Sequence, residues 1–425
     1  MTRTTAFFSL AFLLSSTSSL IASTTPAFPG EEEMILSSSS SPLPSFRTVD
    51  QIAASNEGFV EVILDISEEA IPEITLGIMP SEANARHFIE EEGLDFSGKG
   101  EERGSKEKLP RIGLSIDGGG IRGLMPAIWL EALEGEIQGK FPKVPLYEVF
   151  DYVGGTSIGG ILALGVGADL VPHDLTYLLE KEGKNVFSTE GRKLMRIMDF
   201  FGLEIHQYSA HNLQRLLQDN FGSITLSEAK TDVLITACTN KSHPWIFKRE
   251  ENKPYKIWEV ARCTSAAPTY FSGYKPTLEG YNDHPHLVDG GIWVNNPSTL
   301  IAASIVQDYQ GRIFKPSKLH MLSLGTGECP TTAIPISTGK KSAGAIIEAL
   351  MGSHSRGNHM VMSQLLGDNY HRINPELPTA IDLDNTKDRT IQLLRSYAEK
   401  DEHATAITTF VDQVEEVIRH KLERD

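Results

Sequence analysis

Apolar and polar segments alternate between residues 111 and 330 in a way that predicts a sheet covered by helices. Short apolar runs at 111–116, 232–239 and 318–327 are typical of buried strands, and the segment 153–167 combines a strand, a tight turn and a helix. Helical spacing occurs at 124–133, 209–219, 255–262 and 298–309. Strands that alternate with helices favour an α/β fold whose sheet is buried on both faces.

The flanking regions have a different pattern. After the last strand the chain is mostly helical, with predicted helices at 342–353, 359–370 and 402–423. Ahead of the first strand we expect a strand at 59–66 and a short helix at 81–93. Two polar segments are typical of linkers, the Ser-rich stretch 31–45 and the Gly- and Lys-bearing stretch 98–108.

The first residues carry a short apolar run, Ala6–Leu14, preceded by Arg3. A run of nine residues suits the core of a signal peptide and is too short to span a bilayer. We expect a secretory signal over residues 1–22, which implies export, although no clean A-x-A cleavage site follows. The alternative is an unprocessed, disordered tail on a cytoplasmic protein that is peripheral on membranes.

Charge and cysteine content exclude several classes of protein. The 425 residues carry a net charge of −17, which disfavours sequence-independent binding of nucleic acid. The cysteines, Cys238, Cys263 and Cys329, are odd in number and widely spaced. A disulfide scaffold and a structural zinc site are therefore unsupported, and without an H-E-x-x-H set we expect no catalytic metal.

The strongest chemical signal is the run Gly155-Thr156-Ser157-Ile158-Gly159, which fits G-x-S-x-G where a strand meets a helix. Nucleophilic catalysis needs a serine hydroxyl exposed on a sharp turn, and small neighbours allow that turn. The helix that follows directs its first N–H groups toward developing negative charge. An ordinary glycine-rich turn is the alternative.

A second signal, Asp117 to Gly123, follows the first strand and opens a helix. Its G-x-G-x-x-G spacing suggests a dinucleotide site, but residues 137–147 lack the acidic residue that would bind a ribose. The other interpretation is an oxyanion hole built from backbone N–H groups. Arg122 then contacts a phosphate, or pairs with a carboxylate in the body of the protein.

A third signal is Asp289-Gly290-Gly291, which follows Leu287-Val288. Asp289 is a candidate base for the Ser157 proton, and an Asx turn is the alternative. A Ser-His-Asp triad would also need a histidine, and none lies in a recognisable motif. The candidates are His284, His286, His320, His354, His359, His371, His403 and His420.

Taken together and in this order, DGGGIRG, GTSIGG and VDGG resemble the patatin-like phospholipase family. The stretches 259–271, 295–297 and 322–327 look like that family too, so the resemblance covers about residues 111–330. It implies a three-layer α/β/α domain with a mainly parallel sheet, followed by a helical C-terminal part. We expect N-terminal extension and linker at 23–110, a catalytic domain at 111–330 and the helical region at 331–425.

The resemblance also implies a chemistry. Ser157 would be the nucleophile and Asp289 the general base of a dyad, with Gly118, Gly119, Gly120 and Arg122 as the oxyanion loop. Gly123, Gly155, Gly159, Gly290 and Gly291 match the remaining motif positions. The expected activity is calcium-independent hydrolysis of fatty-acyl esters of membrane lipids through an acyl-enzyme, with no cofactor. The alternatives are an acyltransferase, a Ser-His-Asp esterase, or a non-catalytic module that binds lipid or nucleotide.

Contact with a membrane surface is suggested by the basic and apolar mixture in residues 187–202. A basic amphipathic segment can lie on a lipid surface. We favour the other interpretation, a helix that faces the core and exposes its cationic side, because such helices are more common.

Overall fold

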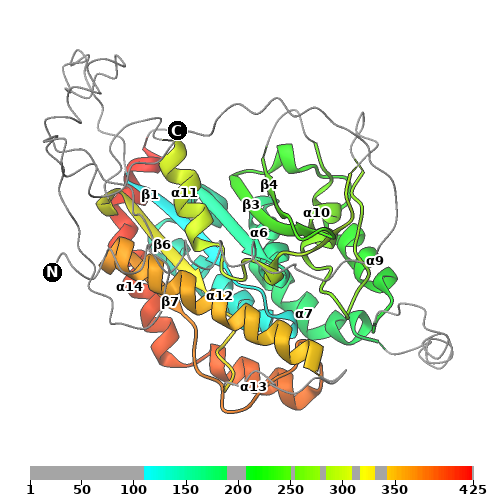
Figure 1. The fold of residues 1–425 in the computed structure, drawn as a ribbon. Helices are drawn as coiled ribbons and strands as arrows, with labels where there is room; N and C mark the ends of the chain where they lie inside the picture. Colours follow the sequence, from blue (N-terminus) through cyan, green and yellow to red (C-terminus); the bar gives the residue numbers. More distant parts are fainter. Residues whose placement is uncertain are drawn as a thin grey trace, which may run out of the picture. The chain divides into compact units, whose positions relative to one another are not determined.

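The protein is built around a seven-stranded sheet (Figure 1). The computed structural model describes residues 110–188, 207–249, 254–277, 284–308, 316–330 and 342–423. All of them belong to one compact unit, Ser105–Asp425. The strand order is β4-β3-β2-β1-β6-β7, and β5 pairs with β3. The strands are β1 Arg111–Ile116, β2 Tyr152–Thr156, β3 Asp232–Thr239, β4 Pro244–Lys248, β5 Leu287–Asp289, β6 Leu319–Leu324 and β7 Tyr370–Ile373.

The sheet is parallel except at one side. β1 pairs in parallel with β2 and β6, β2 pairs in parallel with β3, and β6 pairs in parallel with β7. β4 and β5 run antiparallel to β3. The carboxyl ends of β1, β2 and β6 therefore meet at one edge, and β5 brings its own end to the same region from the opposite direction.

Helices cover both faces of this sheet (Figure 1). Those on one face are α11 and α12, while α4, α6, α10 and α14 contribute to the core on the other. The helices are α4 Leu124–Lys140, α5 Leu146–Val149, α6 Ile158–Gly167, α7 Pro172–Val186, α9 Ala210–Phe221, α10 Ile257–Thr264, α11 Ser298–Asp308, α12 Ser342–Leu366, α13 Asp388–Ala398 and α14 Asp401–Leu422. Short 3-10 turns add η1 Gly120–Gly123, η2 Leu226–Glu228, η3 Gly290–Ile292, η4 Pro316–Lys318 and η5 Gly367–Asn369.

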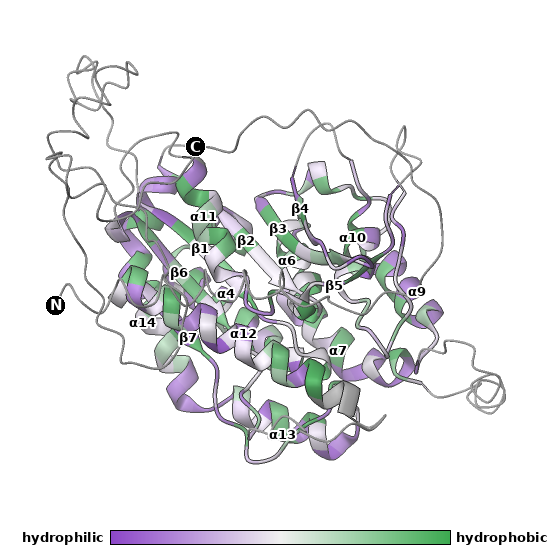
Figure 2. Ribbon diagram, viewed as in Figure 1, coloured by the Kyte–Doolittle hydropathy of each residue, from purple (hydrophilic) through white to green (hydrophobic). Residues whose placement is uncertain are grey.

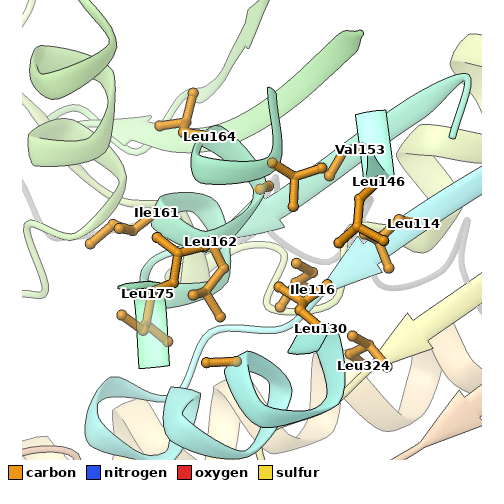
Figure 3. Close-up of a cluster of buried hydrophobic side chains, with 14 of the residues drawn as sticks. Leu114, Ile116, Leu130, Leu146, Val153, Ile161, Leu162, Leu164, Leu175 and Leu324 are labelled. Atoms are coloured by element: carbon orange, nitrogen blue, oxygen red, sulfur yellow. The ribbon is translucent and has the colours of Figure 1, made fainter. Parts of the chain in front are cut away.

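Strand β1 shows why both faces are buried. Its alternate residues Ile112, Leu114 and Ile116 pack with α4, α6 and α7 in the larger cluster, part of which Figure 3 shows. On the other side Gly113 faces Met321 and Ile301, which belong to a second cluster with α11 and α12. With no solvated face, the strand is apolar almost throughout, as expected for a parallel sheet.

The prediction of a three-layer α/β/α fold with a mostly parallel sheet and a helical C-terminal part is confirmed. One detail is wrong. The predicted helices 342–353 and 359–370 form the single helix α12, and the chain then turns into strand β7 at Tyr370. Glycines in mid-helix are tolerated at a modest energetic cost, so Gly352 and Gly357 do not end α12.

Several predicted features fall outside the described residues. They are the signal peptide at 1–22, the extension up to residue 109 with its strand and helix, and most of the amphipathic segment 187–202. In the described part of the chain, no helix has the length and apolar character needed to cross a bilayer.

Candidate active site

Ser157 occupies a sharp turn between β2 and α6, and the backbone there has φ 56° and ψ −125°. A positive φ is unusual for a residue with a side chain and marks a strained position. The turn is possible because its neighbours lack side chains. A Cβ on Gly155 would lie 2.0 Å from the Gly159 carbonyl oxygen, and one on Gly159 would lie 2.3 Å from that of Ile116. The predicted strand, turn and helix are therefore present around Ser157.

Asp289 lies at the end of β5, and its Oδ1 accepts the Gly291 amide at 2.7 Å. Asp289 is 3% exposed, and burial raises the pKa of its carboxyl group from 3.8 to about 6. The interactions of this carboxyl group with the Ser157 side chain and the Gly291 amide act in the other direction and lower the pKa. The structure thus brings together the two residues that the sequence places 132 positions apart.

The glycine loop after β1 faces this pair. Gly118 is held on both sides: its amide donates to the Asn295 carbonyl at 3.2 Å, and its carbonyl accepts from Asn295 Nδ2 at 3.2 Å and Thr326 Oγ1 at 2.8 Å. The Gly118 amide is therefore engaged and not free to bind an oxyanion. Within the described residues, the amides of Gly119 and Gly120 have no such acceptor.

Gly120 has φ +57°, and a Cβ on it would lie 2.3 Å from the Leu383 carbonyl oxygen. The same carbonyl accepts the Ile121 amide at 2.8 Å. The loop is therefore held by the segment between β7 and α13, and no sequence pattern connects the two.

Arg122 lies in the loop but does not line the cleft beside Ser157. Its Nε is 3.4 Å from the Gly119 carbonyl oxygen and its Nη1 is 2.7 Å from Cys329 Sγ. The guanidinium thus contacts the loop at Gly119, and the role of Gly118, Gly119, Gly120 and Arg122 as an oxyanion hole stays a prediction.

Gly123 and Gly290 allow close packing around the site. A Cβ on Gly123 would lie 2.4 Å from Ile158 Cγ1, and one on Gly290 would lie 2.2 Å from Thr236 Oγ1. The absence of a side chain at these two motif positions therefore lets η1 pack closely on α6 and η3 on β3.

An apolar cleft opens beside Ser157 and Asp289. It encloses about 910 Å³ of empty space, including the part open to solvent. Apart from Ser157, Asp289 and Ser265, its walls are aliphatic, aromatic or glycine and come from α6, α7, α9, α12 and the loop after α10. They include Ile161 and Ile158, Leu178, Leu179 and Val186, Leu213, Leu216 and Leu217, Pro268, Tyr270 and Phe271, and Ile347 and Met351.

No histidine lines this cleft in the described part of the chain. His284, which with His286 lies just ahead of Asp289 in sequence, contacts the Tyr255 hydroxyl at 3.4 Å, and burial lowers its pKa. His320, His354, His359 and His403 are likewise partly buried, which lowers their pKa values. Among the described residues, no three His, Cys, Asp or Glu side chains are arranged to hold a metal ion.

Sequence reasoning missed several residues that support the site. Thr264 Oγ1 accepts the Ser157 amide at 2.9 Å, and Asn295 and Thr326 hold Gly118. In the sequence, Asn295 stands out only as part of the stretch 295–297 that looks like the family. Arg372 on β7 and Ser355 on α12 both contact the carboxylate of Asp117, directly ahead of the glycine loop. Sequence separations of 107 to 255 residues leave no local spacing signal for these contacts.

The model of the family described as patatin-like phospholipase matches residues 114–302 of this chain. A cGAMP-activated phospholipase from Pseudomonas aeruginosa is 30% identical over 271 residues, which cover 61% of this chain and 77% of that protein. This chain belongs to the patatin-like phospholipase family.

Other members of the family share a smaller part of their length with this chain. Patatin-17 from Solanum cardiophyllum is 31% identical over 240 residues, which are 50% of this chain and 60% of that protein. The calcium-independent phospholipase A2-gamma of Rattus norvegicus is 28% identical over 312 residues, 66% of this chain and 37% of that protein. The chain thus spans most of the bacterial relative and a smaller part of the plant and rat ones.

Proposed function

We propose that this protein is a lipid acyl hydrolase of the phospholipase A type, which uses Ser157 as nucleophile and Asp289 as general base. The observation that carries the proposal is that the Ser157 hydroxyl interacts with the buried Asp289 carboxyl group and that both residues line an apolar cleft. Membership of the patatin-like phospholipase family supports the same class of reaction.

In the first half of the reaction, Asp289 takes the Ser157 hydroxyl proton while Oγ attacks the ester carbonyl carbon. The carbonyl π electrons move to oxygen, and the amides of Gly119 and Gly120 donate hydrogen bonds to the oxyanion. Such donors, fixed before the reaction begins, stabilise the transition state strongly. When the intermediate collapses, the C–O bond to the alcohol breaks and Asp289 returns its proton to the leaving oxygen, which leaves an acyl-enzyme.

The second half repeats these steps with water. Asp289 accepts a proton as the water oxygen attacks the acyl carbon, the bond to Ser157 Oγ breaks, and Oγ recovers the proton from Asp289. The fatty acid leaves and the enzyme returns to its starting state. No step in this scheme uses calcium or another metal.

The position of Asp289 explains how a carboxylate can act as the base. A free aspartate, with a pKa near 3.9, binds protons weakly at neutral pH. Burial raises the pKa of Asp289 to about 6, so the group stays largely ionised near neutral pH and still accepts a proton more readily than a solvated aspartate. A histidine is not needed to activate Ser157.

The lining of the cleft indicates the part of the substrate that it binds. Aliphatic and aromatic walls suit a long acyl chain, because burial of each methylene contributes about 0.8 kcal/mol. The polar head group would remain at the mouth. The relatives named as phospholipases support a membrane lipid as the source of that chain.

Hydrolysis of a short-chain ester by purified protein, in the presence of a chelator, tests the proposal. We expect turnover by the wild type, none by Ser157→Ala, and a loss of about 10²- to 10⁴-fold in Asp289→Asn. Single His→Ala variants should keep most of the activity. A histidine variant as inactive as Ser157→Ala would instead indicate a triad, and a folded but inactive wild type would favour a module that only binds lipid.

A further inference from the structure

The helix α12 carries an uncharged apolar stripe on its exposed face. Its large apolar members, Ile346, Leu350, Met360, Val361 and Leu365, are 40–53% exposed, and they are five of the eight exposed large hydrophobic residues of the described chain. The other exposed positions described on this helix are Ser353, Gly357 and Gln364. We define these eight residues as the α12 stripe.

The geometry of the helix places the stripe on one face. At 3.6 residues per turn its members fall within about 140° of the helix circumference, and they extend over about 29 Å along the axis. Its apolar members form two groups, Ile346 with Leu350 and Met360 with Val361 and Leu365, and the uncharged residues Ser353 and Gly357 lie between them. Figure 2 shows hydrophobic colour along much of the N-terminal part of α12. Exposed apolar residues gathered on one face mark an interaction site more often than scattered single residues do.

The stripe adjoins the candidate active site. Ile347 and Met351, one position after Ile346 and Leu350, line the cleft beside Ser157. Met351 also packs on the loop of the candidate base, since a Cβ on Gly291 would lie 3.3 Å from Met351 Cε. Any surface to which the stripe binds therefore lies next to the wall of the cleft that would bind the acyl chain.

The charges on the stripe and on the whole protein indicate which kind of lipid surface the stripe can bind. None of the eight residues of the stripe is charged, and Arg356 at its border is paired with Glu328 at 2.7 Å. A helix that binds anionic lipids usually presents several Lys or Arg residues, and the net charge of −17 would repel such a surface. An apolar, uncharged stripe on an acidic protein matches a lipid surface without net charge.

We propose that the α12 stripe docks this protein on an uncharged lipid surface, such as a zwitterionic phospholipid or glycolipid membrane, and places the cleft at that surface. The role that docking plays rests on the proposed hydrolase activity, but the vesicle-binding test does not require that activity. An ester that leaves a bilayer would then pass along Ile347 and Met351 toward Ser157 with little exposure to water.

The test measures flotation of the full chain with phosphatidylcholine vesicles, and uses Ser157→Ala as the background so that no lipid is consumed. Two variants form a matched pair, because Val361 in the stripe and Val171 ahead of α7 are both 53% exposed. We expect Val361→Asp and Leu350→Asp each to weaken vesicle binding about tenfold or more, and Val171→Asp to leave it unchanged. Binding should be insensitive to salt and weaker with phosphatidylglycerol vesicles.

Turnover of a soluble short-chain ester separates this inference from the proposed function. Stripe variants of the active enzyme should hydrolyse the soluble ester at the wild-type rate and lose activity only on vesicles. If the wild type is inactive on every ester but binds vesicles through the stripe, the hydrolase proposal fails and the docking proposal stands.

Other results would overturn the docking proposal. They are equal vesicle binding by Val361→Asp and Val171→Asp, salt-sensitive binding that prefers phosphatidylglycerol, or a dimer that Val361→Asp dissociates without any change in vesicle binding. The last result would assign the stripe to a second copy of the chain. If thermal melting shows that Leu350→Asp or Val361→Asp is misfolded, Leu350→Ser and Val361→Ser replace those two variants.

Discussion

The buried ion pair between Arg372 and Asp117 offers a demanding test of how the glycine loop is held. Arg372 Nη2 and Nη1 lie 2.7 and 3.2 Å from the two carboxylate oxygens of Asp117, and the side chains are only 7% and 2% exposed. Ser323 accepts a further hydrogen bond from Arg372 at 2.7 Å, and Ser355 contacts both partners. Asp117 is the residue directly ahead of Gly118, so the pair fixes the start of the loop.

We expect Arg372→Met to destabilise the fold by about 3–5 kcal/mol, because it leaves a carboxylate buried without a cation. The loop would also lose its anchor, and a displacement of about 1 Å at the oxyanion donors can lower kcat by about 10²-fold. KM should change less, since the walls of the cleft are on other elements. Arg372→Lys should recover part of the stability but not the bidentate geometry.

Denaturant unfolding and ester kinetics measure both effects. The control is Arg356→Met, which removes an ion pair with Glu328 whose side chains are 43% and 35% exposed, one position along α12 from Ser355. Exposed pairs contribute about 0–1 kcal/mol. If Arg372→Met is no more destabilising than Arg356→Met, and kcat is unchanged, the pair does not hold the loop and the reasoning is refuted.

The remaining predictions concern the base and the turn. The pH profile of kcat/KM should rise about tenfold per unit below the Asp289 pKa of about 6 and level off above it; a flat profile down to about pH 4 would exclude Asp289 as the base. Because the folded-state pKa of Asp289 exceeds its unfolded value of 3.8, the contribution of this group to stability is complete below 3.8 and is lost as the pH rises through about 6. Asp289→Asn should therefore be more stable than the wild type by up to about 3 kcal/mol at about pH 8 and not at about pH 4, as denaturant melts at the two pH values would show. Gly155→Ala should abolish activity and destabilise the protein, since its Cβ would lie 2.0 Å from a carbonyl oxygen, whereas Gly135→Ala, which meets nothing within 4 Å, should be neutral or stabilising in the same thermal melts.

The sequence predicts most of the sheet because its strands are long or lie next to motifs. β1, β2 and β6 combine apolar runs with glycine-rich turns, β3 is a mostly apolar run of 8 residues, and each is predicted close to its observed bounds. β7 was missed because it has only four residues, Tyr370–Ile373, with His371 and Arg372 between the apolar ends. Its place beside β6 is set by tertiary pairing, for which four residues give no local signal.

The site was predictable where the chemistry depends on adjacent residues. A strained serine turn needs glycines at fixed spacing, so GTSIG points to Ser157. The separate motif DGG points to Asp289. The supports were not predictable, because Asn295, Thr326 and Arg372 reach the loop from elements 177 to 255 residues away. The roles given to the site residues and the domain limits at 22, 110 and 330 stay predictions.

Covalent labelling of Ser157 tests the central claim most directly. An alkyl fluorophosphonate reacts when Ser157 Oγ attacks phosphorus and expels fluoride, and the mass of the intact protein reports the adduct. We predict one adduct on the wild type in the presence of a chelator, located on Ser157, none on Ser157→Ala, and labelling of Asp289→Asn slower by about 10² or more. Labelling of Asp289→Asn at the wild-type rate, or an adduct on another residue, would contradict the Ser157–Asp289 dyad.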